Sequence, residues 1–116
     1  MPSDQSFTDF VLDQLGALPG LRAKAMFGGR GLYCGDQFFG ILDEGRLYFK
    51  VNDATRAAYV GQGMEPFTYE QRGRRMTMNY YEVPPDVLEN RVELVAWAER
   101  AIQVAATAPR TAKKSR

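Results

Sequence analysis

Histidine is absent from this sequence of 116 residues. Its absence removes the commonest general base near neutral pH and the commonest transition-metal ligand. The single cysteine, Cys34, has no second thiol for a disulfide or a zinc site, and no histidine to activate it as a nucleophile. Serine occurs only at Ser3, Ser6 and Ser115, near the chain ends. We therefore expect no catalytic residues, no metal and no cofactor.

Long apolar runs are also missing. None approaches the roughly 18 residues of a membrane span, and the first five residues lack the basic and apolar regions of a signal peptide. The hydrophobic content of 45% and the charged content of 25% are ordinary globular values. These observations predict one cytoplasmic domain without a membrane partner.

The net charge of +1 is unevenly distributed along the chain. Residues 1–21 carry three acids and no base, and residues 81–109 carry five acids against two bases. Residues 22–80 carry nine bases against six acids, and the last seven residues add four bases. The middle of the chain is thus basic and its flanks are acidic, which matters once the segments have shapes.

Apolar periodicity, caps and glycine turns divide the chain into helices and strands. The predicted order is a helix from Ser6 to about Gly16, strands at 22–28, 32–42 and 46–51, a helix at 54–60, strands at 67–71 and 75–81, and helices from 84 to about 106. A turn or bulge at Gly35-Asp36 is expected to break the second strand, and a short turn of helix to precede the last, long one. Consecutive strands joined by tight turns predict an α+β fold in two layers. In it, helices cover one face of a five-stranded antiparallel sheet and leave the other face open.

The glycines at Gly28, Gly29 and Gly31 raise the question of a phosphate-binding loop. The GxxxxGK[ST] spacing and the strand-to-helix context of such a loop are missing. A structural turn that needs positive φ or close backbone approach is the favoured interpretation, with a ligand contact as the alternative.

Four blocks of sequence, in order, resemble the N-terminal domain of the TfoX/Sxy family. They are Met26-Phe27-Gly28-Gly29-x-Gly31-Leu32-Tyr33, Gly45-Arg46-Leu47-Tyr48-Phe49-Lys50-Val51-Asn52, Glu65-Pro66-Phe67-Thr68-Tyr69 and Met78-Asn79-Tyr80-Tyr81-Glu82-Val83-Pro84. The resemblance spans roughly residues 5–106. It implies a secretion-chaperone-like α+β domain, no catalytic residues, and a link to natural competence, in which full-length members activate DNA-uptake genes together with the cyclic-AMP receptor protein.

Full-length members of that family carry a further helical domain, for which residues 107–116 leave no room. We therefore expect a stand-alone N-terminal domain at residues 1–106, followed by a disordered basic tail at 107–116.

Strand alternation places a set of basic and polar side chains on the open face of the predicted sheet. They are Arg22, Lys24, Arg46, Tyr48, Lys50, Arg72, Arg75, Thr77 and Asn79. The acidic helices would then lie on the opposite side. The candidate partner-binding residues are the bases and the tyrosine of this region, with the Arg72–Arg75 hairpin tip included: Lys24, Arg46, Tyr48, Lys50, Arg72, Arg74 and Arg75.

Such a face admits three interpretations, which are an ordinary solvated sheet surface, a protein-binding or homodimer surface, and a nucleic-acid surface. The leading functional hypothesis is a regulatory or adaptor domain that binds a protein through this face. The alternative is a nucleic-acid-binding accessory that uses the face and residues 110–116. A small-ligand binder or enzyme that uses the glycine turn and the tyrosines is a third hypothesis.

Overall fold

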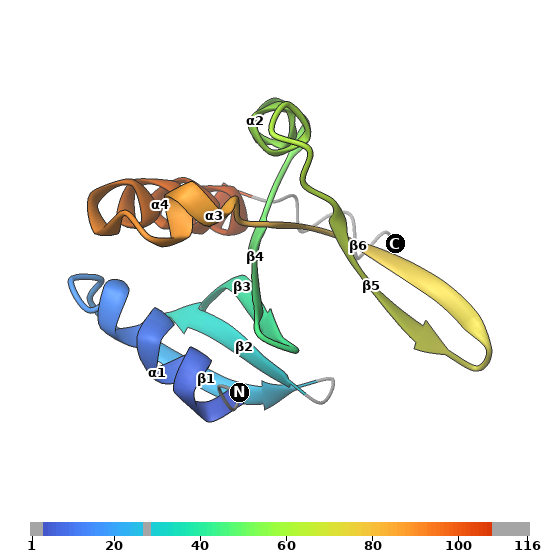
Figure 1. Cartoon of the computed structure of the whole chain (residues 1–116), viewed down its shortest axis with the longest axis horizontal. Coiled ribbons are helices and arrows are strands. Elements are labelled where there is room, and N and C mark those ends of the chain that lie inside the picture. The colour runs from blue at the N-terminus through green and yellow to red at the C-terminus, as the bar shows by residue number, and fades with distance from the viewer. Residues whose placement is uncertain (1–3, 27–28, 108–116) are drawn as a thin grey trace.

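An antiparallel sheet with helices on one side organises the chain (Figure 1). The computed structural model describes residues 4–26 and 29–107. Its elements are α1 (Asp4–Gln14), β1 (Leu21–Met26), β2 (Gly29–Cys34), β3 (Gln37–Asp43), β4 (Arg46–Lys50), α2 (Asp53–Val60), β5 (Pro66–Gln71), β6 (Arg74–Glu82), α3 (Pro85–Leu88) and α4 (Arg91–Thr107). The predicted α+β class and the antiparallel sheet are confirmed, as is the short α3 before the long α4.

The sheet has six strands in the order β1-β2-β3-β4-β6-β5, whereas five were predicted. The difference lies at Gly35-Asp36, where Gly35 has a φ of +59°. That left-handed conformation is cheap for glycine, so the chain closes a complete hairpin there and does not merely bulge. The expected strand over 32–42 is therefore two strands, β2 and β3.

The main core lies between the sheet and its helices. Buried side chains from all four helices join one cluster with Leu32 of β2, Phe39 of β3 and Phe49 of β4. Within β4 the alternation is as predicted, since Leu47 and Phe49 are buried. Helices therefore cover one face of the sheet, as the sequence predicted.

A second, smaller core occupies the opposite face of the sheet. Ile41, Phe67 and Tyr80 are 0%, 2% and 3% exposed although no described helix packs over them. Half-buried side chains surround this cluster: Phe38, Tyr48, Tyr69 and Met78. Figure 1 shows the hairpin of β5 and β6 extending away from α1 and α4. The open face is therefore not the solvated surface that alternation alone suggested.

Candidate partner-binding face

The strand register fixes which side chains share the face opposite the helices, here called the open face. Ile41 pairs with Tyr48, Tyr48 with Glu82, and Lys50 with Tyr80. Directly paired residues point to the same side of a sheet, and alternate residues along a strand point the same way. Arg46, Tyr48 and Lys50 of β4 therefore lie on the open face, as predicted.

Aromatic rings form the floor of the open face in two chains of contacts. Phe38 has its ring centroid 5.1 Å from that of Tyr33 and 5.3 Å from that of Tyr80. Phe67 lies 5.1 Å from Tyr48, edge to face, and 6.0 Å from Tyr69, stacked. The Tyr80 hydroxyl donates to the Phe38 carbonyl at 3.4 Å. These are the preferred geometries of aromatic pairs, so the rings hold one another in place.

Cationic side chains lie over this floor. Arg22 and Lys24 of β1 sit 5.4 and 5.3 Å from the centroid of Tyr33, and Lys50 sits 5.1 Å from that of Tyr80. Burial lowers the pKa of the Lys50 ammonium, because a partly desolvated site disfavours the charged form. These are cation–π distances, so the bases are positioned by the rings beneath them.

An ion pair lies on the same face, at the start of β4. Arg46 donates to the Glu82 carboxylate at 3.1 Å, and that carboxylate raises the pKa of the Arg46 guanidinium. Burial raises the pKa of the neighbouring Tyr48 hydroxyl, so Tyr48 stays neutral and can donate a hydrogen bond. The face thus combines apolar rings, bases and hydroxyl groups.

Strand β6 presents the opposite alternation from the one predicted. Because Lys50 pairs with Tyr80, the even-numbered residues Met76, Met78 and Tyr80 lie on the open face. Arg75, Thr77 and Asn79 point to the other face of the sheet, where all three are exposed. The alternation of Met76, Met78 and Tyr80 is visible in the sequence, but alternation alone does not say which side of a strand the helices cover.

The structure divides the hairpin-tip arginines. Arg72 lies in the turn with a φ of +55°, outside both strands. Arg74 pairs with Gln71 on the open-face side, whereas Arg75 pairs with Glu70 on the other. Of the seven candidate residues, Lys24, Arg46, Tyr48, Lys50 and Arg74 therefore share the open face.

The glycine segment lies at the start of β2. Gly29 and Gly31 are strand residues rather than turn residues, and Gly28 lies outside the described residues. A Cβ on Gly29 would overlap the Leu42 carbonyl oxygen, and one on Gly31 would lie 2.9 Å from the Met26 sulfur and 3.0 Å from the Phe38 ring. At Gly29 the backbone itself leaves no room for a side chain, whereas at Gly31 the nearest atoms belong to side chains, of which the flexible Met26 can shift.

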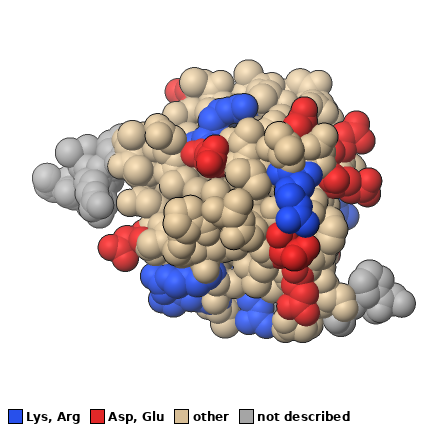
Figure 2. Space-filling model, turned by 90° about the vertical axis from the view of Figure 1, so that its left-hand side faces the viewer, with Lys and Arg blue, Asp and Glu red and all other residues tan. Residues whose placement is uncertain are grey.

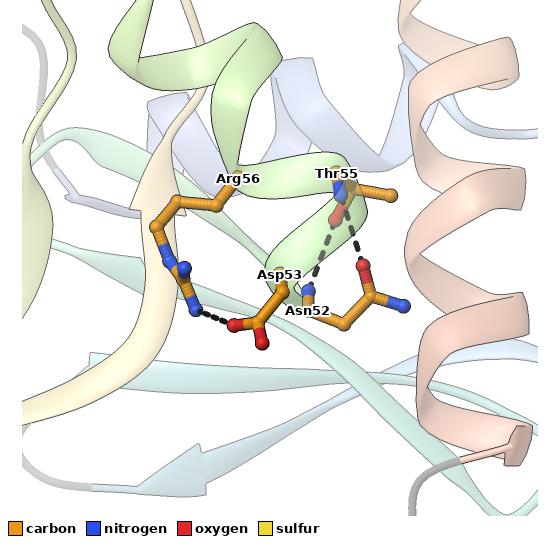
Figure 3. Close-up of polar contacts among 4 residues, drawn as sticks. All are labelled: Asn52, Asp53, Thr55 and Arg56. Atoms are coloured by element: carbon orange, nitrogen blue, oxygen red, sulfur yellow. Dashed lines mark hydrogen bonds and ion pairs between the residues drawn. The ribbon is translucent and has the colours of Figure 1, made fainter.

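Polar groups at the start of α2 line one cavity with Lys50, and Figure 3 shows how they contact one another. Asn52 accepts from the Thr55 N–H at 2.9 Å, Thr55 accepts from the Asn52 N–H at 3.0 Å, and Arg56 pairs with Asp53 at 2.8 Å. This capping box satisfies amides that could otherwise bind an anion. The helix start is therefore a structural feature.

Charge on the side of the molecule that faces left in Figure 1 is mixed. Figure 2 shows Lys and Arg interspersed with Asp and Glu there, among many uncharged residues. Arg91 of α4 pairs with Asp13 of α1 at 3.2 Å. That side of the molecule therefore carries charges of both signs.

Other kinds of site were sought in the described residues. No three His, Cys, Asp or Glu side chains within 4–26 and 29–107 form a group that could hold a metal ion. Of the helices in this part of the chain, none is both long and apolar enough to cross a bilayer.

The fold and its open face define the class of this protein, a small α+β domain whose single antiparallel sheet is covered by helices on one side. The chain belongs to the TfoX N-terminal domain family, whose model matches residues 13–105. This confirms the resemblance seen in the sequence.

Two curated proteins are similar to this chain. Protein Sxy of Escherichia coli (strain K12) is 26% identical over 93 residues, which are 80% of this chain and 44% of that protein. DNA transformation protein TfoX1 of Aliivibrio fischeri (strain ATCC 700601 / ES114) is 28% identical over 80 residues, 69% of this chain and 38% of that protein. The chain thus spans less than half the length of either relative.

Proposed function

We propose that this chain is a non-enzymatic regulatory or adaptor domain that binds a partner protein through the open face. The observation that carries the proposal is the packing of aromatic rings and bases on that face. Aromatic rings, tyrosine hydroxyls and arginines are enriched at protein-binding surfaces. By register, the open face carries more bases than acids. The bases are Arg22, Lys24, Arg46, Lys50 and Arg74, and the acids are Asp43 and Glu82. This excess of positive charge favours an acidic partner.

The same packing argues against a stacking platform for nucleic acid bases. Phe38 stacks on Tyr33, and Arg22 and Lys24 also lie over the Tyr33 ring. Tyr80 is contacted by Phe38 and Lys50. Base stacking needs a free ring face, and these rings already use theirs within the domain. Ring edges and hydroxyl groups remain for a partner.

The relatives suggest a cellular process in which this binding could act. One of them is named a DNA transformation protein, and the family resemblance links such domains to competence and to the cyclic-AMP receptor protein. We take that receptor protein as the first candidate partner and the regulation of DNA uptake as the proposed role.

Titration of the purified chain with the receptor protein, followed calorimetrically, tests the proposal. Lys50→Glu reverses a charge on the open face. Arg100→Glu reverses a charge at an exposed position of α4 and serves as a matched control. We expect Lys50→Glu to weaken binding at least about tenfold and Arg100→Glu to leave it unchanged. Salt screens exposed charges, so a charge outside the interface has little effect on affinity. Equal affinity of both variants would refute the open face as the binding site. Absence of binding by the unaltered chain would refute this partner.

A nucleic-acid role is a second candidate because of the β5–β6 hairpin tip. Arg72, Arg74 and Arg75 are exposed there, and no described acid forms an ion pair with them. Binding to DNA through phosphates should weaken steeply with salt, and deletion of residues 110–116 should reduce the salt slope. No mobility shift of DNA or RNA at low salt would remove this candidate.

A further inference from the structure

The free edge of β1 offers a second surface, separate from the floor of the open face. Within the described residues β1 pairs with β2 alone, and it is the terminal strand of the sheet. It has six residues without proline, glycine or a register shift. The other terminal strand, β5, begins with Pro66 and shifts register before Thr68, which are two common protections of a sheet edge. The β1 edge lacks both.

The ladder between β1 and β2 shows which backbone groups face this edge. Gly35 donates its N–H to the Gly20 carbonyl at 3.1 Å, so Gly20 and Gly35 form a hydrogen-bonded pair. Hydrogen-bonded pairs alternate along an antiparallel ladder, and the next ones are Arg22 with Tyr33 and Lys24 with Gly31. The intervening residues of β1 direct their N–H and C=O groups away from β2: Leu21, Ala23 and Ala25.

We propose that this edge binds an extended segment of a partner protein in which acidic and apolar residues alternate. Such a segment would pair its backbone with Leu21, Ala23 and Ala25 and add a strand to the sheet. Side chains on opposite sides of that strand then meet two different surroundings. The inference does not rest on the proposed function.

The open-face side of the new strand would meet positive charge. Arg22 and Lys24 are exposed at alternate positions of β1 and are steadied over the Tyr33 ring. A carboxylate opposite each base gives a favourable cross-strand pair. Two acids separated by one residue therefore match this side.

The helix side of the new strand would meet a surface that includes exposed apolar side chains of α1. Ala25 is exposed and lines a cavity of about 300 Å³ in which the apolar Phe7 of α1 and Leu42 lie beside the charged Arg30, Asp43 and Glu44. The ring of Phe10, 6.5 Å from that of Phe7, is 41% exposed, one of the few large apolar side chains so exposed in the described chain. Apolar side chains from the segment would cover this surface.

Charge pattern also decides against a second copy of β1 as the occupant. In any two-fold antiparallel pairing of β1 with itself, the outward residues Leu21, Ala23 and Ala25 pair among themselves. In the pairings centred on residue 22, 23 or 24, which overlap β1 most, at least one of Arg22 and Lys24 then lies directly opposite Arg22 or Lys24 of the copy, and like charges directly opposite are destabilising. The chain's own residues 110–116, with four bases and no acid, have the wrong sign as well.

The probe is a labelled peptide of alternating glutamate and valine, compared with a lysine–valine peptide and with a peptide of the same glutamate–valine composition but no alternation. We expect only the alternating acidic peptide to bind, and to slow hydrogen exchange at the Ala23 and Ala25 amides. Ala25→Pro removes an N–H that the fold itself does not use, whereas Ala25→Ser keeps it. The proline variant should bind at least about tenfold more weakly than the serine variant.

The charge part of the proposal has its own variant, since Ala25→Pro could also disturb folding. Arg22→Glu combined with Lys24→Glu should transfer binding to the lysine–valine peptide. Any of four results would overturn the inference: no binding at millimolar peptide, binding without slowed exchange at Ala23 and Ala25, equal binding of acidic and basic peptides, or slowed exchange from self-association without peptide. Lys50→Glu should leave peptide binding intact, so failure here is distinguishable from failure of the proposed function.

Discussion

Truncation of Phe67 to alanine measures how much stability the second core supplies. The side chain is 2% exposed and contacts the rings of Tyr48 and Tyr69. Removal of a buried phenylalanine side chain costs about 3–5 kcal/mol of unfolding free energy. A domain of this size has roughly 5–15 kcal/mol in total. Phe67→Ala should therefore remain folded but lose a large share of its stability.

Urea denaturation followed by circular dichroism is the assay. With a slope of roughly 1–3 kcal/mol per molar urea, a loss of about 4 kcal/mol lowers the midpoint by about 2 M. Phe10→Ala is the matched control, because that ring is 41% exposed. Its cost should stay below about 1 kcal/mol.

A solvated open face makes a different forecast. If Phe67 lay on an ordinary exposed surface, its truncation would change stability by no more than about 0.5 kcal/mol. A midpoint for Phe67→Ala equal to that of Phe10→Ala would therefore refute the second core. It would also remove the aromatic floor on which the proposed function rests.

Three further changes test other parts of the fold. Gly29→Ala should destabilise by more than about 3 kcal/mol because its Cβ overlaps a backbone carbonyl, whereas Gly35→Ala has open space and should lose about 1–2 kcal/mol for its positive φ, both measured by urea denaturation. Asn52→Ala removes one side of the capping box and should lower stability by about 1 kcal/mol, seen as a Tm lower by several degrees. Burial raises the pKa of Tyr59 and of Tyr80 above the ordinary 10.0, so their stabilisation is complete below pH 10 and is lost as pH rises above it. Phenolate absorbance should show both titrating only on alkaline unfolding, and phenylalanine at either position should flatten the loss; titration of either hydroxyl while the chain is still folded would contradict this.

Local chemistry explains why most of the architecture could be predicted from the sequence. The Asp43-Glu44-Gly45 turn needs positive φ, which Glu44 and Gly45 adopt, and the cap at Asn52 starts α2 as expected. Leu47 and Phe49 face the main core because β4 alternates cleanly. Each of these features depends on residues close together in the chain.

The facing of β6 could not be predicted because it depends on pairing between distant strands. Met76, Met78 and Tyr80 alternate with polar residues along β6, so they share one side of the strand and the polar residues share the other. Either side could have been the helix-covered one. The pairing of Lys50 with Tyr80 decides between them, and a one-residue difference exchanges the two faces. The second core includes Tyr80 of β6, so it could not be predicted without this pairing.

The second core also limits how the open face can bind. Ile41, Phe67 and Tyr80 are already buried within the domain, so a partner gains no apolar burial from them. Binding energy must come from the half-buried rings and from bases such as Lys50 at their margin. Apolar contact is then modest and the charge contribution is screened by salt. We therefore expect a partner complex whose affinity falls between low and physiological salt, and whose Lys50→Glu variant loses part of that salt dependence. A complex indifferent to salt would show that the bases of the open face do not contact the partner.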